Sequence, residues 1–141
     1  MKPMTTEERD RLCEILFFKY FERRTSMTCK ISKLLKEFGI PANVLGYHYL
    51  RHAITVVVNE PDTMHSITKV LYPRVAENFN TTCSRVERAC RHAIELGWDK
   101  ANSELIDKYF GWSLKAGNKP TNSEFIATLA DSLITNTNDE G

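Results

Sequence analysis

Residues 66–98 carry the strongest structural pattern in the sequence, two stretches with apolar residues at helical spacing separated by a short polar turn. Asn80 lies between the two stretches, and asparagine tolerates the left-handed backbone that a tight turn requires. The short polar residues at 81–84 suit a helix N-cap, and Ser84 and Glu87 also have the spacing of a capping box. The pattern therefore predicts two helices joined by a tight turn, and it leaves the first residue of the second helix open.

The spacing of small and aliphatic residues around this turn is the spacing that a DNA-binding helix-turn-helix needs. Ala76 lies four residues before Asn80, and Val86 lies six residues after it. A small residue lets the two helices cross closely, and a buried aliphatic residue anchors the second helix. The outward face of the second helix would carry Arg85, Glu87, Arg88, Arg91 and His92. The spacing leaves two interpretations, a helix that reads DNA or a helical hairpin whose charged face is merely solvated.

The sequence also resembles a known family over three long segments in the same order. These are GIPANVLGYHYLRHAI (39–54), SITKVLYPRVAENFNTTCSRVERACRHAIELGW (66–98) and KPTNSEFIATLADSL (119–133). They resemble the C-terminal effector domain of the sporulation-initiation response regulators, the stage-zero sporulation protein A family, and the likeness covers roughly Ser26 to Leu133. It implies an all-α domain of six or seven helices, containing a helix-turn-helix, that binds double-stranded DNA as a sequence-specific transcription regulator.

The resemblance also implies which residues contact DNA. Reading of TGTCGAA-like boxes would use the helix from about Thr82 to Trp98, with base contacts from Arg85, Glu87 and Arg88. Arginine can donate two hydrogen bonds to guanine, and glutamate can accept one from cytosine N4. The positions that match contacts to the DNA backbone are Ser84, Arg91, His92 and Lys119. Lys119 precedes a capped helix start, whose free N–H groups also favour a phosphate.

The charge distribution restricts a DNA-binding surface to a local patch. The net charge is only +1 over 141 residues, with +2 in residues 66–98 and −3 in residues 99–141. No signal peptide or run long enough to span a membrane is present, and the four cysteines form no CxxC pair. These features favour a cytoplasmic protein with reduced thiols and no membrane partner.

No set of residues indicates an enzyme. The sequence has no glycine-rich phosphate loop, nucleophile elbow or HExxH motif, and it predicts no cofactor. His48 and His52 are four residues apart and could share a metal, but no third ligand is evident, so the sequence favours histidines without a metal. Cys83 and Cys90 lie seven residues apart, too far for a disulfide within one helix, and a redox role is disfavoured.

The chain divides into three regions. Residues 1–24 form an extra amphipathic helix, residues 25–134 form the effector domain, and residues 135–141 form a frayed tail. The predicted helices span 5–24, 25–38, 43–59, 66–79, 82–98 and 103–110, with a last one from 121 to 133. The strand–helix alternation of the family's receiver domain is not found in the first 65 residues, so the chain is either an excised effector domain or a free-standing relative. Met1 and the extra helix favour the second interpretation.

Local signals place the helix ends. The expected N-caps are Thr6, Asn43 and Thr121, the last in a capping box with Glu124. The expected stops are Gly39 and Gly111. Pro73 should kink the first helix of the central motif or mark its first regular turn. Gly97 and Asp99 should loosen the chain after that motif, and Trp112 and Leu114 should dock the following loop on the core.

The first predicted helix has more apolar surface than one buried face needs, because the stretch Leu12–Phe21 is apolar around most of its circumference. A monomer would leave phenylalanines in water, and such surface usually marks an interface. The stretch therefore predicts a homodimer, with Phe17, Phe18 and Phe21 in or near the contact. It also keeps open an alternative function, an interaction module of the same fold that acts by pairing with a full-length relative or with RNA polymerase.

Overall fold

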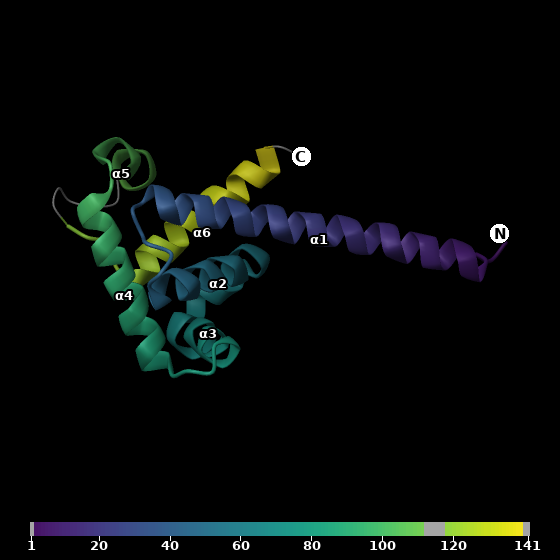
Figure 1. The fold of residues 1–141 in the computed structure, drawn as a ribbon, viewed down its shortest axis with the longest axis horizontal. Helices are drawn as coiled ribbons and strands as arrows, with labels where there is room; N and C mark the ends of the chain where they lie inside the picture. The colour runs from purple at the N-terminus through teal and green to yellow at the C-terminus, as the bar shows by residue number, and fades with distance from the viewer. Residues whose placement is uncertain (1, 112–117, 140–141) are drawn as a thin grey trace.

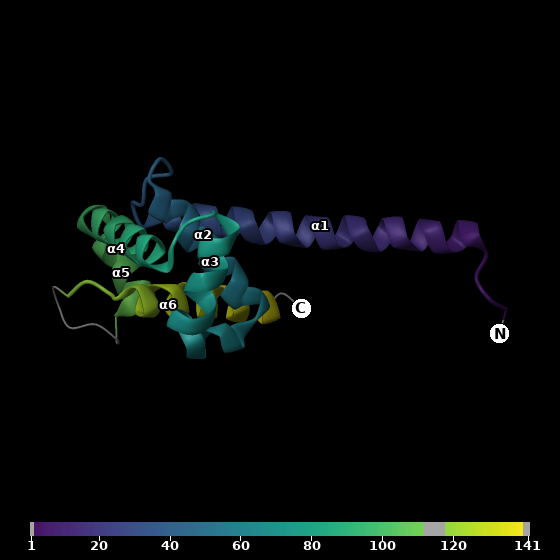
Figure 2. The same ribbon diagram turned by 90° about the horizontal axis from the view of Figure 1, so that it is seen from below.

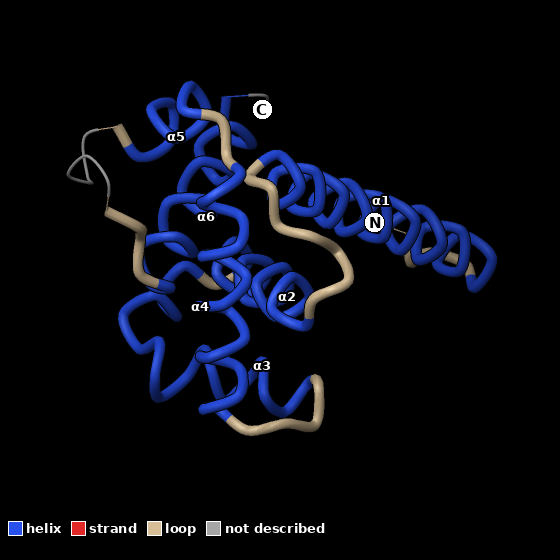
Figure 3. Tube along the Cα trace, turned by 60° about the vertical axis from the view of Figure 1, so that its left-hand side comes forward, coloured by secondary structure: helices blue, strands red, loops and turns tan. Residues whose placement is uncertain are grey.

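The computed structural model describes residues 2–111 and 118–139, and all their side chains except those of 20–25 and 137–139. It contains the helices α1 (Thr6–Glu37), α2 (Leu45–Asn59), α3 (Tyr72–Asn78), α4 (Cys83–Lys100), α5 (Ser103–Phe110) and α6 (Asn122–Asp139). A 3-10 turn, η1 (Pro61–Ser66), and a π-helical turn, η2 (Ile67–Leu71), precede α3. The described residues form helices and loops and no strand (Figure 3), which confirms the all-α class.

Helix α1 is one continuous helix of 32 residues, and the predicted boundary between Arg24 and Thr25 is wrong. Residues 19–30 contain neither glycine nor proline, so nothing in this stretch interrupts the backbone hydrogen bonds. The N-cap is Thr5 rather than Thr6, because the Thr5 hydroxyl accepts a hydrogen bond from the Glu8 N–H at 3.2 Å. The Glu8 carboxylate in turn accepts from the Thr5 N–H at 3.4 Å, which completes a capping box.

The predicted stop of α1 at Gly39 is confirmed. Gly39 has a φ of +80°, and its N–H donates to the Lys36 carbonyl at 2.9 Å. The next N–H, of Ile40, donates to the Leu35 carbonyl at 3.1 Å. These two bonds form a Schellman motif, in which a residue with left-handed backbone ends a helix and glycine is favoured.

Helix α1 extends far beyond the rest of the molecule (Figures 1 and 2). Its last turns pack against α2, with Ile31, Leu34 and Leu35 buried. Its N-terminal part contacts no other helix in these views and carries exposed large apolar side chains, including Phe17 at 70% and Phe18 at 62% exposure. We call residues 6–24 the free half of α1.

Helix α2 is the central helix of the body and makes its most extensive contacts with α4 and α6. It buries Leu50, Ala53 and Ile54, and the β-branched stretch 54–58 is helical as predicted. The predicted cap at Asn43 is wrong: the N-cap is Val44, which forms no side-chain cap. Gly46 sets the distance between α2 and α4, since a Cβ atom there would lie 2.0 Å from the carbonyl oxygen of Ala89.

An aromatic cluster joins the ends of four helices. Phe38 follows α1 and is 1% exposed, and its ring lies 5.5–6.4 Å from four aromatic rings, those of Trp98, Tyr109, Phe110 and Phe125. Gly97 is buried beside this cluster, and its missing Cβ would lie 2.7 Å from the Phe38 carbonyl oxygen. The predicted loosening at Gly97 and Asp99 is therefore wrong, because α4 continues to Lys100 and uses Gly97 for close packing.

The two C-terminal helices begin at side-chain caps. The Asn102 side-chain oxygen accepts from the Glu104 N–H at 2.9 Å, and α5 ends at Gly111 as predicted. Thr121 accepts from the Glu124 N–H at 3.1 Å, which confirms the predicted cap of α6. Helix α6 continues to Asp139, into the segment that the sequence predicted to be frayed. Trp112 and Leu114 lie outside the described residues.

Candidate nucleic-acid interface

Helices α3 and α4 form the predicted helix-turn-helix, and the turn between them is a second Schellman motif. Asn80 has a φ of +51°, the one non-glycine residue with positive φ among those described. The Thr81 N–H donates to the Ala76 carbonyl at 2.9 Å, and the Asn80 N–H donates to the Glu77 carbonyl at 3.3 Å. Thr82 then caps α4 by accepting from the Arg85 N–H at 3.3 Å. Helix α4 therefore begins at Cys83, which answers the question left open by the sequence, and Ser84 lies inside the helix.

The inner faces of the two helices pack as the spacing predicted. Ala76 is 5% exposed and Val86 is fully buried. Cys90, Ala93 and Ile94 continue the buried face of α4. Pro73 lies in the first turn of α3, directly after the π-helical turn, so it marks the first regular turn, which was one of its two predicted roles. The inner face therefore holds α4 firmly with its opposite side outward.

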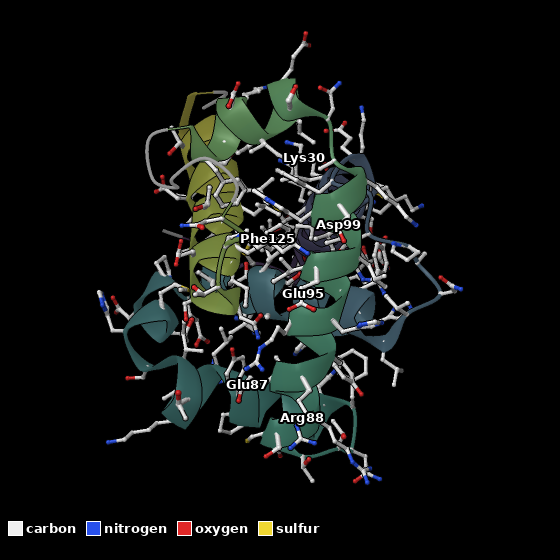
Figure 4. All side chains as sticks on the ribbon, turned by 90° about the vertical axis from the view of Figure 1, so that its left-hand side faces the viewer. Lys30, Glu87, Arg88, Glu95, Asp99 and Phe125 are labelled. Atoms are coloured by element: carbon white, nitrogen blue, oxygen red, sulfur yellow. The ribbon has the colours of Figure 1, made fainter. Side chains whose placement is uncertain are left out.

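The outward side of α4 presents most of the predicted DNA contacts to solvent. The exposed residues of this set are Ser84, Arg85, Arg88, Arg91 and His92. Figure 4 looks directly at this side: α4 crosses in front of the other helices, with Arg88, Glu95 and Asp99 along it. Among the described elements none lies in front of this face, so a duplex could approach it directly.

Glu87 and Arg91, predicted to contact a base and a phosphate, form an ion pair one helical turn apart. Their side chains are 44% and 57% exposed, so water screens this pair and it contributes little to stability. Because a surface pair is weak, the Arg91 guanidinium can leave this carboxylate at small cost.

Asn122, the first residue of α6, ties this helix to both helices of the motif. Its side-chain NH₂ group donates to the Glu87 carbonyl at 2.9 Å and to the Tyr72 hydroxyl at 3.2 Å, and the residue is 8% exposed. Burial raises the pKa of the Tyr72 hydroxyl, and the hydrogen bond to Asn122 partly opposes that shift. Sequence reasoning missed Asn122, because its partners lie 35 and 50 residues away and leave no local signal.

Lys119 and Arg91 line one hollow of about 370 Å³ between α4 and the start of α6, which also includes Glu95. The structure thus brings together two of the predicted phosphate contacts from distant parts of the chain. Lys119 Nζ lies 3.0 Å from a carboxylate oxygen of Asp99. The sequence did not reveal this ion pair.

The four cysteines and His48 are the other candidate site residues in the sequence. All four cysteines are free thiols, and burial raises the pKa of Cys90 to about 12, so its thiol stays neutral. His48 Nε2 donates to the Ala42 carbonyl at 3.0 Å. Within the described ranges, no three His, Cys, Asp or Glu side chains are placed to hold a metal ion. No helix in the same ranges is long and apolar enough to cross a membrane.

Comparison with known families agrees with this geometry. A family model described as "Sporulation initiation factor Spo0A C terminal" matches residues 31–133. The matched segment contains the helix-turn-helix, the exposed face of α4 and the start of α6, and it leaves out the free half of α1. This family consists of DNA-binding domains of transcription regulators, not of enzymes. The chain, matched over well more than half of its length, belongs to the Spo0A C-terminal family of sporulation initiation factors.

Proposed function

We propose that this chain is a cytoplasmic transcription regulator that reads TGTCGAA-like boxes in double-stranded DNA with helix α4. The observation that carries the proposal is the exposed face of α4, where Arg85 and Arg88 are exposed while the opposite side is buried. Arg85 and Arg88 would donate to guanines, and Glu87 would accept from a cytosine. Arg91, Ser84, His92 and Lys119 would hold the phosphates beside them.

The direct test is fluorescence anisotropy of the intact chain with a duplex that carries one box and with a scrambled duplex of the same composition. We expect the box to bind at least tenfold more tightly at physiological salt, since specific sites usually exceed nonspecific ones by about 10³ or more. Equal affinities for the box and the scrambled duplex would instead favour the alternative function, an interaction module that pairs with a full-length relative or RNA polymerase.

Replacing Arg88 with alanine should weaken binding to the box by about 1–3 kcal/mol and relax the preference at one base pair. The reason is that a bidentate arginine contact discriminates one guanine from the other bases. Selection of binding sites from a randomised duplex measures both effects. Lys33→Ala removes a charge from an exposed position on α1 and serves as the control. An Arg88→Ala chain with an unchanged selected motif would contradict the assignment.

Replacing Lys119 or Arg91 with alanine should weaken box and scrambled DNA about equally and lower the salt slope by roughly one. Phosphate contacts carry no base information, so the selected motif should not change. Asp99→Asn is the matched control, because it removes the carboxylate beside Lys119 and should leave binding unchanged or slightly tighter. A changed motif in either alanine variant would move that residue from phosphate contact to base contact.

We also propose that the chain forms a homodimer through the free half of α1. Support comes from the exposure of Leu16, Phe17 and Phe18, at 58%, 70% and 62%. Large apolar patches of this kind usually mark an interface. The side chain of Phe21, the third predicted contact, lies outside the described set. Sedimentation equilibrium should give a dimer for the intact chain and a monomer for a chain starting at Thr25, and a monomeric intact chain would refute the proposal.

A further inference from the structure

The free half of α1 points away from the surface that would read DNA. In Figure 1, α4 lies at one end of the molecule and the N-terminus at the other. Figure 4 views the exposed side of α4, and α1 recedes behind it almost end-on. A duplex lying on Arg88 would therefore be on the opposite side of the body from the free half of α1. The free half cannot contact the same duplex, so its exposed apolar residues need another partner.

The two ends of the free half carry opposite net charges. Residues 7–14 contain four acidic and two basic residues, a net charge of −2. Residues 19–24 contain three basic residues and one acidic residue, a net charge of +2. The uncharged, exposed segment Ile15–Phe18 separates them. The free half therefore complements a second copy of itself that runs in the opposite direction.

A parallel pair would have the reverse electrostatics. It would place the acidic segments of the two copies together and the basic segments together, whereas an antiparallel pair places each acidic segment beside a basic one. Charges that flank an apolar helical seam are known to set the orientation of paired helices. The apolar segment lies at the centre of this pattern, so one two-fold axis near residue 16 satisfies both the apolar contact and the charges.

We propose that two copies pair antiparallel through their free halves, and that the dimer holds two separate DNA duplexes, one at each end. The proposal rests on the proposed DNA-binding function. At 1.5 Å per residue, the two Cys29 residues would lie about 40 Å apart along the helix pair. The two effector domains would lie farther apart than the two Cys29 residues. Their α4 faces would point outward in opposite directions. Adjacent boxes on one short duplex are then out of reach of the second copy.

A bead-capture experiment tests whether one dimer bridges two DNA duplexes. A biotinylated duplex with one box is held on beads, and a fluorescent duplex with one box is added with the intact chain. We expect the beads to retain the fluorescent duplex only when the chain is present. The chain that starts at Thr25 should bind each duplex in anisotropy but capture none. Box-dependent binding by the intact chain without capture overturns the bridging proposal and leaves the proposed function standing, whereas loss of box-dependent binding overturns both.

Charge variants test the orientation. Glu7→Lys with Glu14→Lys gives residues 7–14 a net charge of +2 and leaves the Thr5–Glu8 capping box intact, so in an antiparallel pair they would face the basic segment of the partner. We expect dimer affinity and capture to fall by about tenfold, and the further changes Arg23→Glu and Arg24→Glu to restore them. A parallel pair predicts no loss for the first variant, because like charges would still face like charges. An unchanged dimer affinity in that variant therefore overturns the antiparallel arrangement.

A distance measurement gives an independent result. Spin labels on Cys29, in a chain with Cys13→Ser and Cys83→Ser, should be separated by about 40 Å in the antiparallel dimer. In a parallel dimer the same labels would lie within about 10–20 Å, because neighbouring helix axes are 8–10 Å apart. Cys90 is buried and is not expected to react. A short distance overturns the antiparallel arrangement whatever the capture experiment gives.

Discussion

Replacing Gly46 with alanine is expected to destabilise the protein by about 3 kcal/mol, because overpacking two rigid backbones allows little relaxation. The added Cβ would lie 2.0 Å from the Ala89 carbonyl oxygen and 2.6 Å from the Ala93 Cβ. Both neighbours belong to α4, so neither can rotate away, and α2 must shift as a whole. Alanine is the better helix former by about 1 kcal/mol, which offsets only part of this cost.

Urea unfolding followed by far-UV circular dichroism measures this loss, and Gly39→Ala provides the comparison. Gly39 has a φ of +80°, so alanine there costs about 1–2 kcal/mol in backbone strain without the same clash. We therefore expect Gly46→Ala to be the more damaging change. Since α2 supports α4 and shifts in this variant, the affinity of the variant for the box should also fall. Equal stabilities of the two variants would show that α2 and α4 do not pack at this distance.

Replacing Phe38 with alanine is expected to cost about 3–5 kcal/mol, the range for removing a fully buried phenylalanine. The ring is 1% exposed and contacts aromatic residues of α4, α5 and α6. Its removal would leave a cavity where four elements meet, and none of them can collapse into it without losing contacts elsewhere. Guanidinium unfolding should show a lower midpoint with a similar slope.

Phe79→Ala is the matched control for this prediction. Phe79 is 37% exposed and its ring lies 5.0 Å from that of Tyr49 in a tilted contact. Because much of the ring is already in water, its removal should cost about 1 kcal/mol. A Phe38→Ala chain no less stable than the Phe79→Ala chain would mean that the aromatic cluster does not hold the ends of the helices together.

The features that the sequence predicted correctly depend on neighbours in the chain. The turn at Asn80, the stop at Gly39, and the buried Ala76 and Val86 follow from backbone preferences and from the 3.6-residue period. The same period decides that Arg85 and Arg88 lie on the accessible side of α4, opposite Val86. Local physics was sufficient here, because a helix places each side chain relative to the next without help from the rest of the fold.

The wrong predictions arose where one local sequence signal is compatible with more than one structure. The sequence divided α1 between Arg24 and Thr25, although no residue there breaks a helix. It assigned Gly97 to a loosened end, whereas the glycine is needed because the backbone after α1 approaches α4 there. Glycine permits both a break and a close approach. Only the position of the neighbouring segment decides between them.

By itself, the sequence determined the all-α class, the helix-turn-helix and the chemical character of the α4 face, since these depend on spacing within one or two helices. Only the tertiary structure decided that Asn122 joins α6 to both helices of the motif, that Lys119 and Arg91 line one hollow, and that Asp99 holds Lys119 in the free protein. It also decided that the free half of α1 points away from α4. These relations depend on how whole helix surfaces pack, and no local pattern encodes the distance or direction between helices far apart in the chain.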